Sequence, residues 1–441
     1  MSPVLRNTAL FAGMAALLVA TGVFQSWNVS LTILQMGLIS GIMALGVNIQ
    51  WGYAGLLNVG VMGFVAIGGL AAVLVAAPRD AQAWAAGGPG IIVALLAGAA
   101  TIFAAIQAWR LLPRGWLRGL AVIVILAVGY GIYRSLFDPA RDAVEAIEPA
   151  LRGNIGGLGL PIMLAWPVGG VLAAGAAWVV GKTALGLRSD YLAIATLGIS
   201  EIIIAVLKNE DWLSRGVKNV IGLPRPVPYE VTLQNTPTFV ERATELGMNP
   251  VHAASLYVKL GYTALFLVVL LVLLWMAQRA LHSPWGRMMR AIRDNEVAAE
   301  AMGKDVTRRH LQVFILGSAI CGVAGAMMTT LDSQLTPGTY QPLRYTFLIW
   351  VMVIVGGSGN NFGAVLGGFV IWFVWIQAEP AGLWLMRTIT DTFTFGPAMQ
   401  SHLVDSAPHL RMLLMGAILL TVMRFSPRGL IPEKSAAKPL P

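Results

Sequence analysis

The sequence is poor in charge and nearly free of cysteine. Charged residues make up 12% of its 441 residues and hydrophobic residues 57%, whereas soluble domains carry about 25% charge. This shortage of polar surface excludes an ordinary soluble protein. The one cysteine, Cys321, lies inside an apolar run, so it can form no internal disulfide and we expect it to serve packing.

Patterns of catalytic or metal-binding residues are also absent. The five histidines are scattered over expected loops and helix ends and lack metal-ligand spacing. The segment GAAWVVGKT (175–183) has alanine at position 176, where a phosphate-binding loop requires glycine, and no strand precedes it. No basic patch interleaved with exposed aromatics points to nucleic acid. We therefore expect a chain that is no enzyme, binds neither metal nor nucleic acid, and hydrolyses no ATP itself.

Long apolar runs predict an all-α polytopic membrane protein. Several runs reach or approach the roughly 20 residues that cross a bilayer as a helix. The first run, 8–24, follows a single arginine and has no cleavage pattern, so we expect a transmembrane helix and not a removable signal. We predict about 10–12 transmembrane helices, some of them broken or re-entrant, in one domain covering residues 1–441. The candidate runs lie near 8–24, 30–49, 53–76, 90–109, 118–137, 161–181, 190–207, 257–279, 310–331, 345–356, 362–378 and 409–425.

Loop charge predicts the orientation. Lys and Arg in short loops mark the inner face of a membrane, and with the N-terminus inside every basic loop falls on that face. The net charge of +9 therefore reports orientation and contact with anionic membrane lipid. We expect a bacterial inner (plasma) membrane protein with cytoplasmic N- and C-termini and a periplasmic loop at 209–256. The basic loops hold Arg110, Arg114 and Arg118; Lys182 and Arg188; residues 279–309; and the tail with Arg424, Arg428, Lys434 and Lys438.

Three stretches look unsuited to plain spanning helices. Residues 51–69 and 355–368 are rich in glycine, and residues 188–209 place polar groups at membrane depth. Irregular backbone at that depth requires surrounding protein or a water-filled cavity, and glycine-interrupted segments in both halves of a chain are typical of transporters. The alternative is close helix packing through small residues. The polar residues of these stretches include Asn58, Thr196, Glu201, Asn360 and Asn361.

Glu201 is the one acidic residue expected well inside a span. An ionisable residue inside the membrane suggests a functional site. The alternative is a structural ion pair with Lys208, two helical turns further on, or with Arg188 near the other end of the helix.

Residues 283–310, SPWGRMMRAIRDNEVAAEAMGKDVTRRH, form a polar interruption between two apolar runs, which we call the elbow. Residues 279–309 contain seven Lys/Arg and four Asp/Glu, a balance of 7 − 4 = +3, so the elbow is expected in the cytoplasm. Small residues at Ala298, Ala299 and Gly303 leave a tight helix face that Gly303 can end. Because small residues allow close approach, this helix face predicts that a partner protein docks on the elbow.

Several motifs in order carry a family resemblance. They are Gly55-Leu56-Leu57-Asn58, RSDYLAIATLGISEII, the elbow sequence SPWGRMMRAIRDNEVAAEAMG, VMVIVGGSGNNFGAVLGG and FSPRGLI. This order resembles the permease subunits of branched-chain amino acid ABC transporters, the LivM-like branch in particular, over most of 30–76, 160–225 and 257–430. Residues 78–159 have no counterpart in shorter members and are expected to add two spans. Arg215 and Asn219 stand where the family tends to have glycine, which leaves the solute open.

The resemblance implies an ATP-driven importer of Leu, Ile and Val. It implies a second related permease subunit, two cytoplasmic ATPase subunits that hold ATP and Mg, a periplasmic solute-binding protein, and no cofactor on this chain. Val297-Ala298-Ala299 followed by Gly303 resembles the E-A-A-x-x-x-G signature that seats in the ATPase, with Val in place of Glu. Coupling is thereby assigned to Arg287, Arg290, Arg293, Ala298, Ala299 and Gly303. The candidates to line or gate the substrate path are the polar residues of the three unusual stretches, Asn58, Thr196, Glu201, Asn360 and Asn361.

Two other functions stay open at this point. The same superfamily includes permeases for urea and short-chain amides. A protein of another class, an ion-driven secondary transporter, would be expected to carry more intramembrane carboxylates than Glu201 alone. The 209–256 loop either meets a soluble partner or is a solvated excursion.

Overall fold

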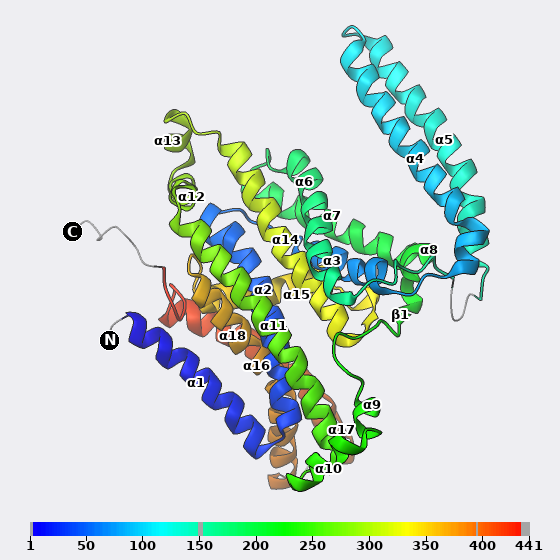
Figure 1. Ribbon diagram of the computed structural model, residues 1–441. Helices are drawn as coiled ribbons and strands as arrows, with labels where there is room; N and C mark the ends of the chain where they lie inside the picture. The colour runs from blue at the N-terminus through cyan, green and yellow to red at the C-terminus, as the bar shows by residue number, and fades with distance from the viewer. Residues whose placement is uncertain (1–2, 149–152, 394–395, 434–441) are drawn as a thin grey trace.

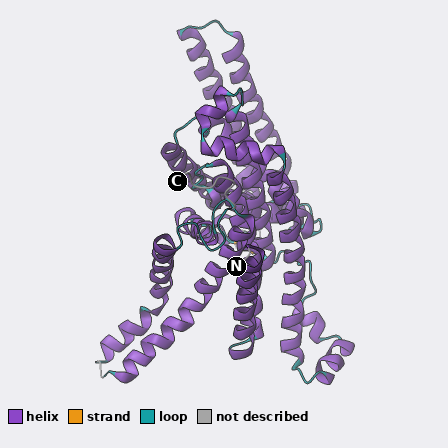
Figure 2. Cartoon of the chain, turned by 90° about the vertical axis from the view of Figure 1, so that its left-hand side faces the viewer, coloured by secondary structure: helices purple, strands orange, loops and turns teal. Residues whose placement is uncertain are grey.

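The structure, a computed structural model, describes residues 3–148, 153–393 and 396–433. These residues are almost entirely helical (Figures 1 and 2), with one short antiparallel pair of strands. The elements are α1 (Pro3–Phe24), α2 (Trp27–Ala54), α3 (Val61–Ala76), α4 (Ala81–Leu111), α5 (Trp116–Glu145), η1 (Ile162–Leu164), α6 (Ala165–Ala184), α7 (Ser189–Asn209), α8 (Asp211–Ser214), η2 (Gly216–Lys218), β1 (Val220–Ile221), α9 (Glu230–Gln234), α10 (Pro237–Glu245), α11 (Pro250–His282), α12 (Pro284–Asp294), α13 (Glu296–Ala301), α14 (Val306–Asp332), β2 (Gln334–Leu335), η3 (Pro337–Thr339), α15 (Pro342–Gly356), α16 (Asn361–Thr392), α17 (Pro397–Asp405), η4 (Ala407–His409) and α18 (Leu410–Phe425).

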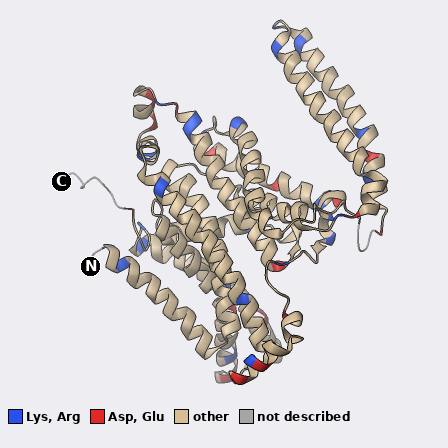
Figure 3. Ribbon diagram, viewed as in Figure 1, with Lys and Arg blue, Asp and Glu red and all other residues tan. Residues whose placement is uncertain are grey.

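Ten helical segments of the described chain are long and apolar enough to cross a membrane. They are α1, α2, α4, α5, η1 with α6, α7, α11, α14, α16, and α17 through α18, while α3 and α15 are shorter apolar helices. Most charged side chains lie near the ends of the helices (Figure 3). The prediction of an all-α polytopic membrane protein is therefore confirmed. Lys434 and Lys438 of the predicted basic tail lie outside the described residues.

The centre of the bundle is formed by α2 and α14. α2 packs against α11, α14 and α16, and α14 packs against α3 and α6. Glycine allows these helices to touch backbone to backbone, because a Cβ at Gly68 of α3 would collide with the carbonyl oxygen of Gly322, and one at Gly325 with that of Val65. Close packing through small residues is thus correct for the α3–α14 crossing.

A hairpin of α4 and α5 stands apart from this bundle (Figure 1). The two helices pack on each other along their length. A small separate core at the base joins Phe137 and Val144 of α5 to Trp212 of α8. Elsewhere large apolar side chains such as Phe103 and Ile123 are exposed, which suits a hairpin surrounded by lipid. The hairpin lies in the segment that the sequence predicts to be an insertion.

The expectation that residues 51–69 do not form a plain spanning helix is confirmed. α2 ends at Ala54, Gly55 adopts a left-handed conformation with φ +69°, and α3 begins only at Val61. The carbonyl groups of Gln50 and Trp51 are satisfied by the Gly55 and Leu56 amides, as in helix ends capped by glycine. The chain therefore crosses this region as a long helix, a six-residue break and a short helix.

The two other unusual stretches differ from what the sequence predicts. Residues 189–209 form one unbroken helix, because Leu192, Thr196, Ser200 and Ile204 recur every four residues and pack their side chains inward. The glycine-rich break at 357–360 separates two helices of unequal length. α15 is short, but α16 runs for 32 residues to Thr392, past its predicted end at 378 and through Pro380.

The 209–256 loop is ordered into short elements. β1 pairs with β2 in the register Val220 with Leu335 and Ile221 with Gln334. Arg225 forms an ion pair with Glu230 at 2.9 Å and donates to the Ser333 hydroxyl at 2.8 Å. These contacts fasten the loop to the C-terminal end of α14.

Candidate functional site

The elbow is built from two short helices with defined ends. Pro284 occupies the first turn of α12, where its missing amide hydrogen carries no cost. The Asn295 side chain accepts from the Ala298 amide at 3.0 Å and begins α13. Gly303, with φ +75°, follows the end of α13, and Asp305 caps α14. The predictions that the elbow is helical and that Gly303 ends a helix are confirmed.

The exposed face of α13 differs from the expected one. Ala298 and Gly303 are exposed, but Ala299 is buried against its own chain. Two large apolar side chains that the sequence reasoning missed, Val297 and Met302, are 76% and 78% exposed. The sequence does contain a signal for them, because they are large apolar residues within a strongly charged segment. The exposed side of α13 and the turn after it therefore combine the apolar Val297 and Met302 with the charged Glu296 and Glu300.

The three arginines of α12 face different surroundings. Arg287 is exposed and donates to the His282 carbonyl at 3.3 Å. Arg290 donates to the Leu281 carbonyl at 3.2 Å and lines a cavity. Arg293 points into the protein, where it donates to the Gly52 carbonyl at the end of α2 and pairs with Glu433 at 2.9 Å.

The charge of Arg293 is held by its neighbours. Partial burial lowers the pKa of its guanidinium, but hydrogen bonds and charge from Glu433 and Asp294 outweigh this and raise the pKa above its ordinary value. Arg293 is therefore a fixed positive charge that ties α12 to other parts of the chain.

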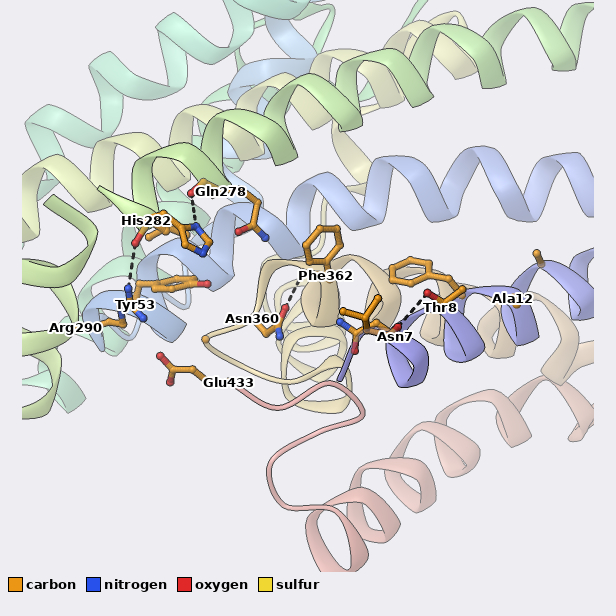
Figure 4. Close-up of a pocket in the computed structure, with 15 residues that line it drawn as sticks. Asn7, Thr8, Ala12, Tyr53, Gln278, His282, Arg290, Asn360, Phe362 and Glu433 are labelled. Carbon is orange, nitrogen blue, oxygen red and sulfur yellow. Dashed lines mark hydrogen bonds between the residues drawn. The ribbon is translucent and has the colours of Figure 1, made fainter. Parts of the chain in front are cut away.

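A cavity of about 770 Å³ adjoins the elbow. Figure 4 shows Asn7, Thr8 and Ala12 of α1 on one side and Tyr53, His282 and Arg290 on the other, with Asn360 and Phe362 between them. Glu433 also lines it.

Asn58 organises the break between α2 and α3. It is 1% exposed, its side-chain amide donates to the Gln50 oxygen at 3.0 Å, and its own side-chain oxygen accepts from the Gly60 amide at 2.9 Å. Gln50 in turn donates to Ser318 and to the Phe314 carbonyl of α14. The network provides hydrogen-bond partners for buried polar groups that the break in the helix would otherwise leave unsatisfied.

Thr196 meets this break from α7. Its hydroxyl accepts from the Val59 amide at 3.1 Å, and a Cβ at Gly60 would collide with the Thr196 carbonyl oxygen. The structure therefore brings together two of the predicted path residues, Asn58 and Thr196. A second cavity, of about 570 Å³, is lined by Trp51, Leu57, Asp190, Arg293 and four other residues, and neither Asn58 nor Thr196 is among them.

Asn360 and Asn361 lie together at the turn between α15 and α16. Asn360 caps α16 by accepting from the Phe362 amide at 3.0 Å. Asn361 is fully buried and its side-chain oxygen accepts from Asn48 at 3.0 Å. The Asn48 side-chain oxygen accepts from the Gly359 amide at 2.9 Å. The last turns of α2 thus connect both clusters, through Asn48 and Gln50.

Glu201 is not part of either cluster. It lies in the middle of α7 on the exposed side, opposite Thr196 and Ser200. Within the described chain, Glu201 makes no ion pair with Lys208 or Arg188, the two structural partners considered from the sequence. In the described part of the chain no group of three or more His, Cys, Asp or Glu side chains could hold a metal ion.

Comparison with known proteins supplies the family. A family model described as the permease component of branched-chain amino acid transport systems matches residues 116–423. The match begins at the first residue of α5, inside the segment predicted to be an insertion, and includes the whole elbow.

Individual relatives agree with this match. The chain is 28% identical over 327 residues to the high-affinity branched-chain amino acid transport system permease proteins LivM of Escherichia coli (strain K12) and Salmonella typhimurium, and the alignments cover 71% of this chain and 66% of each relative. It is 26% identical over 319 residues to the probable branched-chain amino acid transport permease protein LivM of Methanocaldococcus jannaschii, covering 81% of that protein. The chain thus spans slightly less than two thirds of the two enterobacterial relatives. No solved structure matches it.

Proposed function

This chain belongs to the branched-chain amino acid transport permease family, and from that membership we propose that it is the transmembrane permease subunit of an ATP-driven importer for leucine, isoleucine and valine. The observation that carries the proposal is the family match over residues 116–423, which includes the elbow. A second, related permease subunit would complete the pore.

The elbow is the proposed seat of the cytoplasmic ATPases. Val297 and Ala298 of α13, with Met302 and Gly303 directly after it, offer exposed apolar and small residues. Arg287 is free to pair with acidic groups on an ATPase, because it is exposed and holds its present partner only through one long hydrogen bond. ATP and Mg belong to those ATPase subunits and not to this chain.

The substrate path is proposed to follow the break between α2 and α3. A branched-chain solute needs an apolar passage with few polar groups to orient it. Asn58 and Thr196 fix the backbone of the break through the Gly60 and Val59 amides, and Gly55 and Leu57 of the same break line the 570 Å³ cavity. Asn360 and Asn361 hold the neighbouring turn. A displacement at the elbow would reach this region through α2.

Glu201 has a place in this path only if a second subunit covers α7. A carboxylate at membrane depth costs about 2.5–3.5 kcal/mol when it faces lipid, and Glu201 is exposed on this chain alone. We therefore propose that the exposed face of α7 is turned toward the second permease, where Glu201 borders the shared pore.

The 209–256 loop is proposed to receive a periplasmic solute-binding protein. Its anchoring to α14 through Arg225 and Ser333 keeps it close to the bundle. In this arrangement both termini and the elbow lie in the cytoplasm of a bacterial inner membrane.

Reconstitution tests the proposal and separates it from its alternatives. The chain is purified with its second permease and two ATPases, placed in vesicles with the binding protein, and supplied with labelled leucine, urea or acetamide. We expect uptake of leucine that requires ATP. Uptake of urea or acetamide alone would assign the amide-permease function, and uptake by the purified chain under an ion gradient without ATPases would assign a secondary transporter. Leucine uptake by Glu201→Leu at the wild-type rate would refute the role of Glu201.

A further inference from the structure

The motif FSPRGLI near the end of the chain has no part in the proposed docking or path. Its phenylalanine, Phe425, ends α18. Residues 426–433, which hold the rest of the motif followed by Pro432 and Glu433, leave α18 and run across the end of the α15–α16 hairpin; we call this segment the strap. It starts with a tight turn in which the Gly429 amide donates to the Ser426 carbonyl at 2.8 Å. Gly429 has φ +76°, a conformation that glycine adopts without strain.

Backbone hydrogen bonds fix the strap to the glycine-rich turn. The Leu430 amide donates to the Val355 carbonyl and the Ile431 amide to the Gly356 carbonyl, both at 2.9 Å. The Asn360 side-chain amide donates to the Pro432 carbonyl at 3.2 Å. Ile431 is 1% exposed, so the strap is packed into the bundle and does not lie loosely on it.

The glycines of this turn make room for the strap. A Cβ at Gly357 would collide with the Ile431 carbonyl oxygen, and a Cβ at Gly363 would lie 2.9 Å from that same oxygen. A Cβ at Gly359 would lie 2.7 Å from the Glu433 carboxylate, closer than a carbon and an oxygen normally approach. The glycine richness of VGGSGNNFG is thus explained by the seating of the C-terminal segment.

The end of the strap reaches the elbow. Glu433 accepts from Arg293 of α12 at 2.9 Å, and Arg293 also donates to the Gly52 carbonyl of α2. Both side chains of the ion pair are about three-quarters buried, with 23% and 26% exposed. One carboxylate therefore joins the elbow helix to the strap, and the strap joins it to α15 and α16.

We propose that the strap is the connector that makes α12 and the α15–α16 turn move as one body, with Glu433 as the positioning residue that closes the connection. This inference rests on the proposed function, since it concerns how a displacement of the elbow is transmitted. Without Glu433, α12 loses its link to the strap, and its connection to α15 and α16 runs only through α2, which packs on both of them. ATP hydrolysis then continues while less of each displacement reaches the pore.

The test is the number of leucine molecules taken up per ATP hydrolysed in the reconstituted complex. Glu433→Gln is expected to lower this ratio several-fold, and Glu433→Asp is expected to keep more of it than Glu433→Gln. The ratio separates coupling from stability, because a less stable complex loses uptake and hydrolysis together. The matched control is Glu379→Gln, which removes the Glu379–Arg411 ion pair between α16 and α18 and leaves α12 untouched. A wild-type ratio in Glu433→Gln, or an equal fall in Glu379→Gln, would overturn the inference.

A second measurement on the purified chain needs no transport. Ile431→Cys places a thiol under the strap, and the native Cys321 is 1% exposed and gives little background. We expect slow maleimide labelling of Ile431→Cys and labelling several-fold faster when Glu433→Gln is added. Equal rates would show that Glu433 does not hold the strap. If wild-type vesicles show no ATP-dependent uptake while the labelling rates differ as expected, the proposed function is refuted, but the conclusion that Glu433 holds the strap in place is kept.

Discussion

The side chains of Asn48 and Asn361 meet at 3.0 Å between α2 and the first residue of α16, and both are fully buried. Asn48 also accepts from the Gly359 amide. Asn48→Ala would leave that amide and the Asn361 side chain without these hydrogen-bond partners. Each unsatisfied buried group lowers the free energy of unfolding by about 1–3 kcal/mol. We therefore expect a clearly lower thermal unfolding temperature in detergent.

The control for Asn48 is an exposed asparagine that bonds within its own helix. Asn209 donates to the Ala205 carbonyl at 2.7 Å at the surface. Asn209→Ala is expected to change the unfolding temperature little. Equal shifts in the two variants would show that the Asn48–Asn361 contact does not stabilise the bundle.

The crossing of α3 and α14 depends on the absence of side chains at Gly68 and Gly325. Gly68→Ala would push its Cβ into the Gly322 carbonyl oxygen, and overpacking of this kind costs about 1–3 kcal/mol. Gly175→Ala on α6 meets nothing within 4 Å and, through helix propensity, is expected to be neutral or to stabilise by up to about 1 kcal/mol. Unfolding temperatures of the two variants provide the check. A stable Gly68→Ala protein would contradict the close crossing.

The orientation can be tested with single thiols. Ala298→Cys lies on the exposed face of the elbow and Leu246→Cys on the 209–256 loop, where Leu246 is 74% exposed. In intact cells a membrane-impermeant maleimide is expected to label Leu246→Cys at once and Ala298→Cys only after the membrane is opened. The reverse order would invert the proposed topology. Labelling of both in intact cells would place the two segments on the same side.

The helical architecture was predictable because its signals are local. Apolar runs, proline at the first turn of α12 and glycine after α13 are each visible within a few residues. The continuity of α7 was missed although its signal was present: Leu192, Thr196, Ser200 and Ile204 repeat every four residues. Polar side chains at membrane depth indicate either a break in the helix or a buried helix face. Only their spacing distinguishes the two, since a repeat of about four residues places them on one face of a helix.

The strap could not be found in the sequence. The bond between Arg293 and Glu433 joins residues 140 positions apart, and no local pattern specifies such a partner. The glycines at 356–359 predicted an interruption correctly, but not the segment that fills it. In the same way Ala299 looked equivalent to Ala298, and only the packing of α13 on the bundle separates the buried residue from the exposed one.

The central claim is that ATP-driven force enters this chain at the elbow, and Gly303 tests it most directly. Gly303 has φ +75° and open space around it, so Gly303→Arg adds bulk to the proposed docking surface without displacing any neighbour in the chain. Gly159→Arg is the matched control, because Gly159 also has a positive φ, +67°, and open space but lies outside the elbow. Uptake of leucine and hydrolysis of ATP are measured together in reconstituted vesicles. We expect Gly303→Arg to insert in the membrane yet lose uptake while ATP hydrolysis persists, and Gly159→Arg to behave as wild type; undiminished uptake by Gly303→Arg would contradict the claim.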